Sequence, residues 1–300
     1  MVGRESVGLT VVSRLGLSAL GRAWQDKAGL RPVIDSAFSL LFPADCRICF
    51  EPLVRASRLP VCEPCRDSIV AIEGNRCRVC GERLFSFSRN LAPHAGDADG
   101  EVCGLCRRAA PAFTRAVAYG AFEDALREAV HLLKYDRVLP AAKFLGAKLS
   151  LALTQLPAEG AGGWVVVPVP LHARRLRQRG FNQAELIARA ALRDRAGGAG
   201  FHLHTKCLVR QRETVPQAGL TRRQRRENIR GAFVVRDAAV VLGRDVLLMD
   251  DVFTTGTTIA ECARVLLRAG AARVCAATVA RVLKADRIGK ETAGMERAAA

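Results

Sequence analysis

The chain has 300 residues, of which 50% are hydrophobic, and a formal net charge of +17. This length exceeds that of one common domain, so we expect one well-cored unit and a smaller module. The charge argues against a near-neutral surface and favours a polyanionic partner. Aromatic residues make up only 5% of the chain, which excludes an extensive surface for stacking on bases.

The positive charge is concentrated in one part of the chain. Residues 1–106 hold 13 basic and 12 acidic residues, whereas residues 172–236 hold 16 basic and 4 acidic ones. We interpret this basic region as a phosphate or nucleic-acid surface. The alternative is a solvated face in a protein that is generally rich in arginine.

Residues 1–42 are expected to form an extension that ends in a short amphipathic lead-in helix at Pro32–Phe42. Arg14, Arg22 and Asp35 interrupt the apolar runs here, so no run reaches the ~18 residues that a membrane span needs. The pattern also lacks a signal-peptide core with a cleavage site. We therefore predict a cytoplasmic protein without a membrane span, in which disulfides do not form.

Four CxxC pairs follow, within a predicted module of residues 43–110. This spacing is typical of structural Zn²⁺ sites with four thiolates and no open coordination position. Pairing of consecutive motifs gives two zinc ribbons, while interleaved pairing, a single occupied site and redox chemistry are alternatives. So small a module needs metal to fold. The expected ligands are Cys46, Cys49, Cys62, Cys65, Cys77, Cys80, Cys103 and Cys106.

From residue 111 to 284 the pattern alternates between strands and helices. Strands are expected at Phe113–Tyr119, Trp164–Val169, Val246–Met249 and Val274–Val282, and helices at Glu123–Lys134, Leu139–Leu153, Gln183–Arg193 and Thr257–Ala269. This order predicts an α/β fold with a doubly wound parallel sheet and helices on both faces. Cys207, Cys262 and Cys275 lie in apolar settings and are expected to pack in it. Residues 285–300 are expected to form a disordered tail.

The segment His172–Gly180 carries four arginines and no acid directly after a buried strand. We expect a loop whose guanidinium groups bind phosphate in a bidentate manner. The alternative is a solvated loop that pairs with carboxylates elsewhere. A second basic segment, Arg210–Arg230, is expected to be either a mobile cover over a substrate or a groove that follows a nucleic-acid backbone.

The segment Val246–Thr258 is the most informative one. It places Asp250 and Asp251 at the carboxyl end of a strand, where ligands of open α/β sheets bind. The acids can accept hydrogen bonds from two ribose hydroxyls, and one can reach a Mg²⁺ held by a pyrophosphate. The loop after them opens a helix, and its N–H and hydroxyl groups can hold a phosphate. The loop residues are Thr254, Thr255, Gly256, Thr257 and Thr258.

Walker and Rossmann glycine patterns are absent from the strand ends. The plain alternative for this segment is an ordinary strand, turn and helix with Asp and Thr as turn and cap residues. The acid pair, the threonine loop and both flanking elements occur in register, which favours the phosphate site.

This segment resembles the phosphoribosyl pyrophosphate (PRPP) motif of type I phosphoribosyltransferases. Three further stretches resemble the ComF/GntX family of such proteins: Pro168–Leu171 with Arg175 and Arg179–Gln183; Thr214 with Gln217, Leu220, Arg225 and Asn228; and Leu133–Tyr135. The resemblance extends from about Phe42 to Leu283. It implies a type I phosphoribosyltransferase-like sheet preceded by a double zinc ribbon.

The resemblance also implies roles for individual residues. Asp250 and Asp251 would be the catalytic acids that orient the ribose. Pyrophosphate would be bound by Arg175, Arg179 and Gly180. The candidates for the cover or for nucleic-acid contacts are Asn182, Gln183, Gln217, Arg225 and Asn228.

Three functions are compatible with these features. The first is Mg²⁺-dependent phosphoribosyl transfer from PRPP to an acceptor that no residue identifies. The second is a competence-type protein that binds single-stranded DNA during DNA uptake, together with protein partners. The third is a nucleotide sensor without catalysis.

Overall fold

A computed structural model describes residues 44–53, 57–84, 101–158, 160, 162–193, 200–215 and 221–283. The chain forms two compact units, Met1–Cys62 and Glu63–Ala300. The predicted lead-in helix and the predicted tail lie outside the described residues. In the described ranges, no helix is both long and apolar enough to cross a membrane.

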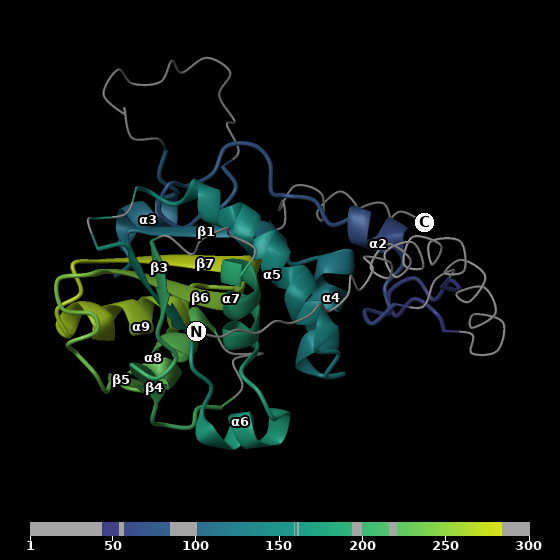
Figure 1. The fold of residues 1–300 in the computed structure, drawn as a ribbon. Helices are drawn as coiled ribbons and strands as arrows, with labels where there is room; N and C mark the ends of the chain where they lie inside the picture. The colour runs from purple at the N-terminus through teal and green to yellow at the C-terminus, as the bar shows by residue number, and fades with distance from the viewer. Residues whose placement is uncertain are drawn as a thin grey trace, which may run out of the picture. The chain divides into compact units, whose positions relative to one another are not determined.

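A five-stranded parallel sheet forms the centre of the second unit (Figure 1). The strand order is β1 (Arg115–Ala121), β7 (Arg273–Arg281), β6 (Asp245–Phe253), β2 (Trp164–Pro168) and β3 (Phe201–Leu203). Uninterrupted apolar runs such as Val246–Met249 form the inner strands because both of their faces are buried. The predicted parallel sheet is confirmed.

Helices cover both faces of this sheet, as predicted. They are α4 (Asp124–Lys134), α5 (Pro140–Ala152, followed by the 3₁₀ turn Leu153–Gln155), α7 (Gln183–Arg193) and α9 (Thr257–Arg268). Val246 and Leu248 of β6 share an apolar cluster with Ile259 and Leu266 of α9. Since alternate strand residues point to opposite faces, Leu247 and Met249 point away from α9. Helices α5 and α7 pack against the sheet on that other side.

The arginine-rich segment after β2 differs from the prediction. It forms helix α6 (Ala173–Arg179), so the expectation of a loop is wrong for these residues. The His172 side chain accepts a hydrogen bond from the Arg174 N–H (3.4 Å), which caps the first turn. Gly180 ends the helix in a left-handed conformation with φ 86°. Arginine, leucine and glutamine favour a helix between these two caps.

The second basic segment also contains regular structure. A two-stranded antiparallel ribbon, β4 (Leu208–Arg210) with β5 (Phe233–Val235), flanks helix α8 (Arg222–Ile229). Thr221 and Gln224 form a capping box at the start of α8. The buried Ile229 anchors α8 in the same apolar cluster as α9.

The cysteine-rich segments contain little regular structure, with the short helices α2 (Glu63–Asp67) and α3 (Gly104–Arg108). In the second unit, this segment hydrogen-bonds to the outer edge of β1. The Ala116 N–H donates to the Val79 carbonyl (2.8 Å), and the Ile72 N–H donates to the Tyr119 carbonyl (2.8 Å). These bonds cover an edge strand that would otherwise be open for pairing.

Candidate functional site

The two candidate acids lie in the last part of β6. Asp251 is 4% exposed and Asp250 is half-buried, and the Asp251 N–H donates to Asp250 Oδ1 (2.9 Å). Both carboxyl groups therefore stand in a region of restricted access to water. Such a position is costly for two charges unless other groups compensate them.

Lys134, at the end of α4, compensates Asp251 by an ion pair. The Lys134 side chain is 17% exposed, so the pair is largely removed from solvent. Gln183 Nε2 also donates to Asp251 Oδ1 (3.4 Å), and Gln183 Oε1 accepts from Arg179 (2.6 Å). Asp251 is thus linked to α4, α7 and α6. Sequence reasoning assigned Lys134 no role beyond its place in a family-like stretch.

The pKa values of the two acids move in opposite directions. Burial and the neighbouring Asp251 charge raise the pKa of Asp250 well above its ordinary value. Burial acts in the same sense on Asp251, but the Lys134 charge and hydrogen bonds lower the pKa of Asp251 below its ordinary value. The pair therefore holds one charged carboxylate and one carboxyl group that favours its proton.

The loop after β6 is shaped by Gly256. Its φ of 73° is left-handed, and a Cβ placed on it would lie 2.5 Å from Cζ of Phe253. Glycine is therefore required both for the turn and for its contact with the ring. The hydroxyls of Thr255 and Thr257 are hydrogen-bonded (2.8 Å), and α9 begins at Thr257. The loop brings the N-terminus of a twelve-residue helix to the carboxyl end of β6, an arrangement suited to an anion.

Arg175 and Arg179 of α6 are half-buried, whereas Arg174 is exposed and pairs with Glu213 (3.4 Å). Burial lowers the pKa of Arg179, the negative charge of Asp251 acts against this, and the positive charge of Arg175 adds to the lowering. The Arg179 guanidinium stands 5.7 Å from the Tyr135 ring centroid. Arg179 is therefore within electrostatic reach of Asp251, whereas Arg174 is occupied by a surface ion pair.

A further arginine, Arg210 of β4, belongs to the same group of charges. Its guanidinium donates to Thr214, stands 5.5 Å from the Phe233 ring centroid and has a buried Nε without a hydrogen-bond partner among the described residues. Burial and the positive charge of Arg175 lower the pKa of Arg210, while Asp250 acts against them. The only sequence signal was its place at the start of the second basic segment.

The remaining candidate residues differ in what their side chains contact. Asn182 donates to the Val169 carbonyl (3.1 Å) and accepts from the Ala184 N–H (3.1 Å), so it fixes the start of α7. Asn228 donates to the Val215 carbonyl (3.0 Å). Arg225 is half-buried in α8, and Gln217 lies outside the described residues. Gln183 contacts the acid pair through its hydrogen bond to Asp251.

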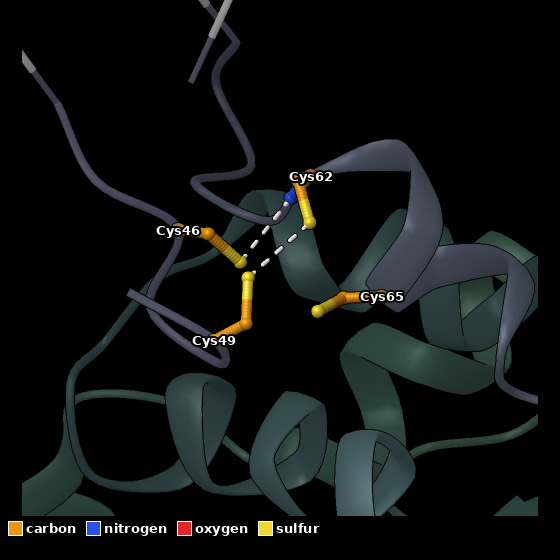
Figure 2. A group of neighbouring side chains, drawn as sticks. All are labelled: Cys46, Cys49, Cys62 and Cys65. Atoms are coloured by element: carbon orange, nitrogen blue, oxygen red, sulfur yellow. Dashed lines mark hydrogen bonds between the residues drawn. The ribbon is translucent and has the colours of Figure 1, made fainter. Parts of the chain in front are cut away.

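The eight CxxC cysteines form two groups of four. Cys46, Cys49, Cys62 and Cys65 form one group, and Cys77, Cys80, Cys103 and Cys106 form the other; the sulfurs in each group lie within 4.8 Å of one another. Figure 2 shows the first group, with its sulfurs turned toward a common centre. Motifs consecutive in sequence are thus brought together. Cys207, Cys262 and Cys275 are buried apart from both groups.

Both groups fit a tetrahedral zinc ion. The Sγ atoms of Cys49 and Cys62 are 3.6 Å apart and those of Cys80 and Cys103 are 3.7 Å apart. Sulfurs bound to one zinc at about 2.3 Å are separated by about this much, whereas a disulfide would need about 2 Å. The residues therefore match structural zinc and would hold it through four thiolates.

The backbone favours the thiolate form at one cysteine of each group. Burial acts against ionisation, but N–H donors including those of Cys62 and Ile48 lower the pKa of Cys46 to about 6. The same balance, with Cys103 N–H as a donor at 3.3 Å, lowers the pKa of Cys77 to about 7. These donors stabilise the negative sulfurs that a zinc ion requires.

Comparisons with known proteins agree with this organisation. The family model for the double zinc ribbon domain matches residues 37–107, and that for the phosphoribosyl transferase domain matches residues 202–293. DNA utilization protein YhgH of Escherichia coli (strain K12) is 32% identical over 71% of this chain and 93% of its own length. Competence protein F of Haemophilus influenzae is 27% identical over 70% and 91%.

Among solved structures, a glutamine PRPP amidotransferase from B. subtilis aligns over 46% of this chain and 26% of its own, with 23% identity and a TM-score of 0.28. The two sequence relatives, in contrast, match over most of both chains. The two four-cysteine groups lie within the double zinc ribbon match, and strands β6 and β7 lie within the phosphoribosyl transferase match. The chain therefore belongs to the competence-type ComF family, in which a double zinc ribbon precedes a phosphoribosyltransferase domain.

Proposed function

We propose that this protein binds PRPP, or a related ribose 5-phosphate compound, at the carboxyl end of β6. The observation that carries this proposal is the buried Asp250–Asp251 pair, balanced by Lys134 and followed by the Gly256 turn that opens α9. A ribose phosphate supplies hydroxyl donors that suit the acids and an anion that suits the helix N-terminus.

Each group has a role in this proposal. Asp250 and Asp251 accept hydrogen bonds from the ribose hydroxyls, and the loop Thr254–Thr258 holds the 5′-phosphate. Arg175 and Arg179, with the turn at Gly180, bind the pyrophosphate. Transfer of the phosphoribosyl group would break the bond between the ribose and pyrophosphate, and the same arginines would stabilise the charge that leaves.

Asp250 is the better candidate for contact with Mg²⁺. Lys134 and Gln183 already bind Asp251. Asp250 is half-buried, and among the described residues no lysine or arginine lies within hydrogen-bond distance of it. Magnesium usually binds one or two carboxylates and retains waters and phosphate oxygens as its other ligands. Asp250 would therefore hold the ion that accompanies the pyrophosphate.

Single-stranded DNA binding is a second candidate function. It is favoured by exposed arginines on the two helices next to the site: Arg177 on α6, and Arg223 and Arg226 on α8. The relatives are called a DNA utilization protein and a competence protein, which adds weight to a role in DNA uptake with protein partners. Binding of this kind would be electrostatic and would weaken steeply with salt.

One matched experiment tests both functions. PRPP binding is followed by calorimetry with Mg²⁺ for the wild type and for Asp250→Asn/Asp251→Asn. We expect micromolar to millimolar affinity in the wild type and at least about a tenfold loss in the variant, because charged hydrogen bonds to the ribose are removed. A wild type without affinity for PRPP or any ribose 5-phosphate contradicts the proposal.

In parallel, binding of a single-stranded oligonucleotide is measured across a salt series for the same two proteins. The second candidate predicts a steep fall with salt, and retention of binding in the double Asn variant because it keeps every arginine. A near-zero salt slope contradicts the electrostatic interpretation.

A further inference from the structure

A second polar hollow lies in the compact unit that contains the sheet, between the second group of cysteines and β1. Its volume is about 310 Å³, at the lower end of the range for small-molecule pockets. Its polar lining includes Asn75, Arg76, Arg78, Arg115 and Gln155. No aspartate or glutamate is among its described lining residues.

This hollow is separate from the candidate PRPP site. Strand β7 lies between β1 and β6, and the hollow lies along residues 115–118 of β1. Two strand spacings amount to about 10 Å, so this face of β1 is well removed from the acids of β6. The hollow shares no lining residue with the acid pair, the threonine loop or the arginines of α6.

Two of its arginines have no ion-pair or hydrogen-bond partner among the described residues. In the part of the chain that the structure describes, the side chains of Arg76 and Arg115 make neither an ion pair nor a hydrogen bond, and both are half-buried. Arg78 adds a third guanidinium to the lining. Arg76 and Arg115 are partly buried cations for which the described residues supply no ion pair, and such cations favour an anion with several acceptor oxygens.

Backbone hydrogen bonds hold the walls of the hollow in place before any ligand binds. The bonds Ala116 N–H to Val79 O and Ile72 N–H to Tyr119 O, each 2.8 Å, join the cysteine segment to β1 at two points. Gly81 permits their close approach, since a Cβ there would lie 3.0 Å from the Ala116 carbonyl oxygen. Cys77, one of the candidate zinc ligands, is part of the wall. An ordered, preformed pocket loses little entropy on binding.

We infer that this hollow is a second anion site that binds the phosphate of a nucleotide, either as a free monophosphate or as part of a single strand. Arg76 and Arg115 would contact the phosphate oxygens, with Arg78 adding positive charge. Asn75 and Gln155 would supply neutral donors and acceptors to the rest of the nucleotide. Binding of this kind does not need aromatic side chains for stacking on a base, because contacts to the phosphate would supply most of the affinity.

The test uses the full-length, zinc-loaded protein with Asp250→Asn/Asp251→Asn, so that nucleotides bound through the ribose at β6 contribute little. Arg76→Gln/Arg115→Gln is added to this background. The matched control is Arg107→Gln/Arg108→Gln, which removes the same charge from exposed arginines outside the hollow. The probes are deoxyadenosine monophosphate and a five-nucleotide single strand, followed by calorimetry.

We expect at least about a tenfold loss of affinity for one or both probes with Arg76→Gln/Arg115→Gln, and less than about a twofold change in the control. Loss for the monophosphate identifies free nucleotides as ligands, and loss for the oligonucleotide alone identifies a DNA strand. The inference is overturned if the background protein binds neither probe, or if both arginine pairs give equal losses. Unchanged zinc content verifies that the module remains folded.

The same arginine substitutions in the wild-type background should leave PRPP binding unchanged. A negative result for the inference about the hollow can therefore be told apart from a negative result for the proposed PRPP site. The first is measured with nucleotide phosphates and the second with PRPP and Mg²⁺.

Discussion

Arg281, the last residue of β7, forms an ion pair with Glu82 at 3.0 Å, and the two side chains are 4% and 10% exposed. The same guanidinium donates to the Cys80 carbonyl and lies 3.8 Å from Cys80 Sγ. It also stands 4.6 Å from the ring centroid of Phe253, the residue that packs against Gly256. One arginine thus joins the second group of four cysteines to the turn that opens α9.

Arg281→Gln should destabilise the protein by about 3 kcal/mol, because it removes the guanidinium that pairs with the buried Glu82 carboxylate. Urea denaturation of the zinc-loaded protein measures this change. Glu82→Gln/Arg281→Gln should recover part of the loss, since the buried carboxylate charge is then removed as well. If the single variant lies within about 0.5 kcal/mol of the wild type, the ion pair is not important for stability.

Zinc content should separate the two cysteine groups. The wild type should hold about two zinc ions per chain, and both Cys49→Ser and Cys80→Ser should lose one of them. Cys49 is exposed, whereas Cys80 is buried in the cluster that includes Phe113 and Phe253. Cys80→Ser should therefore also lower the unfolding temperature of the sheet unit more than Cys49→Ser does.

Elemental analysis and circular dichroism of both variants check this expectation. Less than about one zinc per wild-type chain would contradict two structural ions. Equal melting behaviour of the two variants would show that the second group does not support the sheet.

Gly256→Ala should impair both stability and PRPP binding. The added Cβ would lie 2.5 Å from the Phe253 ring in addition to the left-handed φ of 73°. We expect a loss of about 2–4 kcal/mol. Gly243→Ala is the matched control, because Gly243 has φ 66° and open space around its Cβ position. Its loss should be about 1 kcal/mol with PRPP affinity intact. If Gly256→Ala and Gly243→Ala had comparable effects on PRPP affinity and on stability, the contact with the Phe253 ring would not be the cause of the loss.

The raised pKa of Asp250 gives stability a defined pH dependence. Because the fold favours the protonated acid, the contribution of Asp250 to stability is present at low pH and is lost as the pH rises toward its folded pKa. Asp250→Asn removes this loss. The stability of the variant relative to the wild type should therefore increase as the pH rises from the ordinary aspartate pKa toward the raised pKa of Asp250.

Thermal unfolding of the two proteins across this range provides the measurement. If the unfolding temperatures of the two proteins changed with pH in parallel, burial would not hold the proton on Asp250. In the same range, PRPP affinity of the wild type should rise with pH, since the charged carboxylate is the form that accepts hydroxyl donors and Mg²⁺.

The main elements of the sheet unit could be predicted because their signals are local. Apolar runs identify β2, β6 and β7, and amphipathic spacing identifies α7 at Gln183–Arg193. Helix α6 was missed because none of its side chains is fully buried, so it has no apolar periodicity to detect. Strands β3, β4 and β5 have three residues each, which is too short for an alternating pattern.

The site could be predicted only in part, for a related reason. Asp250, Asp251 and Gly256 stand in one continuous motif, whereas Lys134 is 117 positions from Asp251 and meets it only because α4 ends beside β6. Arg210 and Arg281 are each the last residue of a strand, and sequence spacing does not reveal their burial. Contacts of this kind depend on tertiary packing rather than on local pattern.

The attachment of the second cysteine segment to β1 links metal supply to the fate of the polypeptide in the cell. A molecule that lacks zinc at this site would lose the hydrogen bonds that Val79 and Ile72 make to β1, and the outer side of β1 would be open to other chains. Newly made protein in zinc-starved cells would then be prone to aggregate or to be degraded. Its abundance would follow the zinc status of the cell even if PRPP were plentiful.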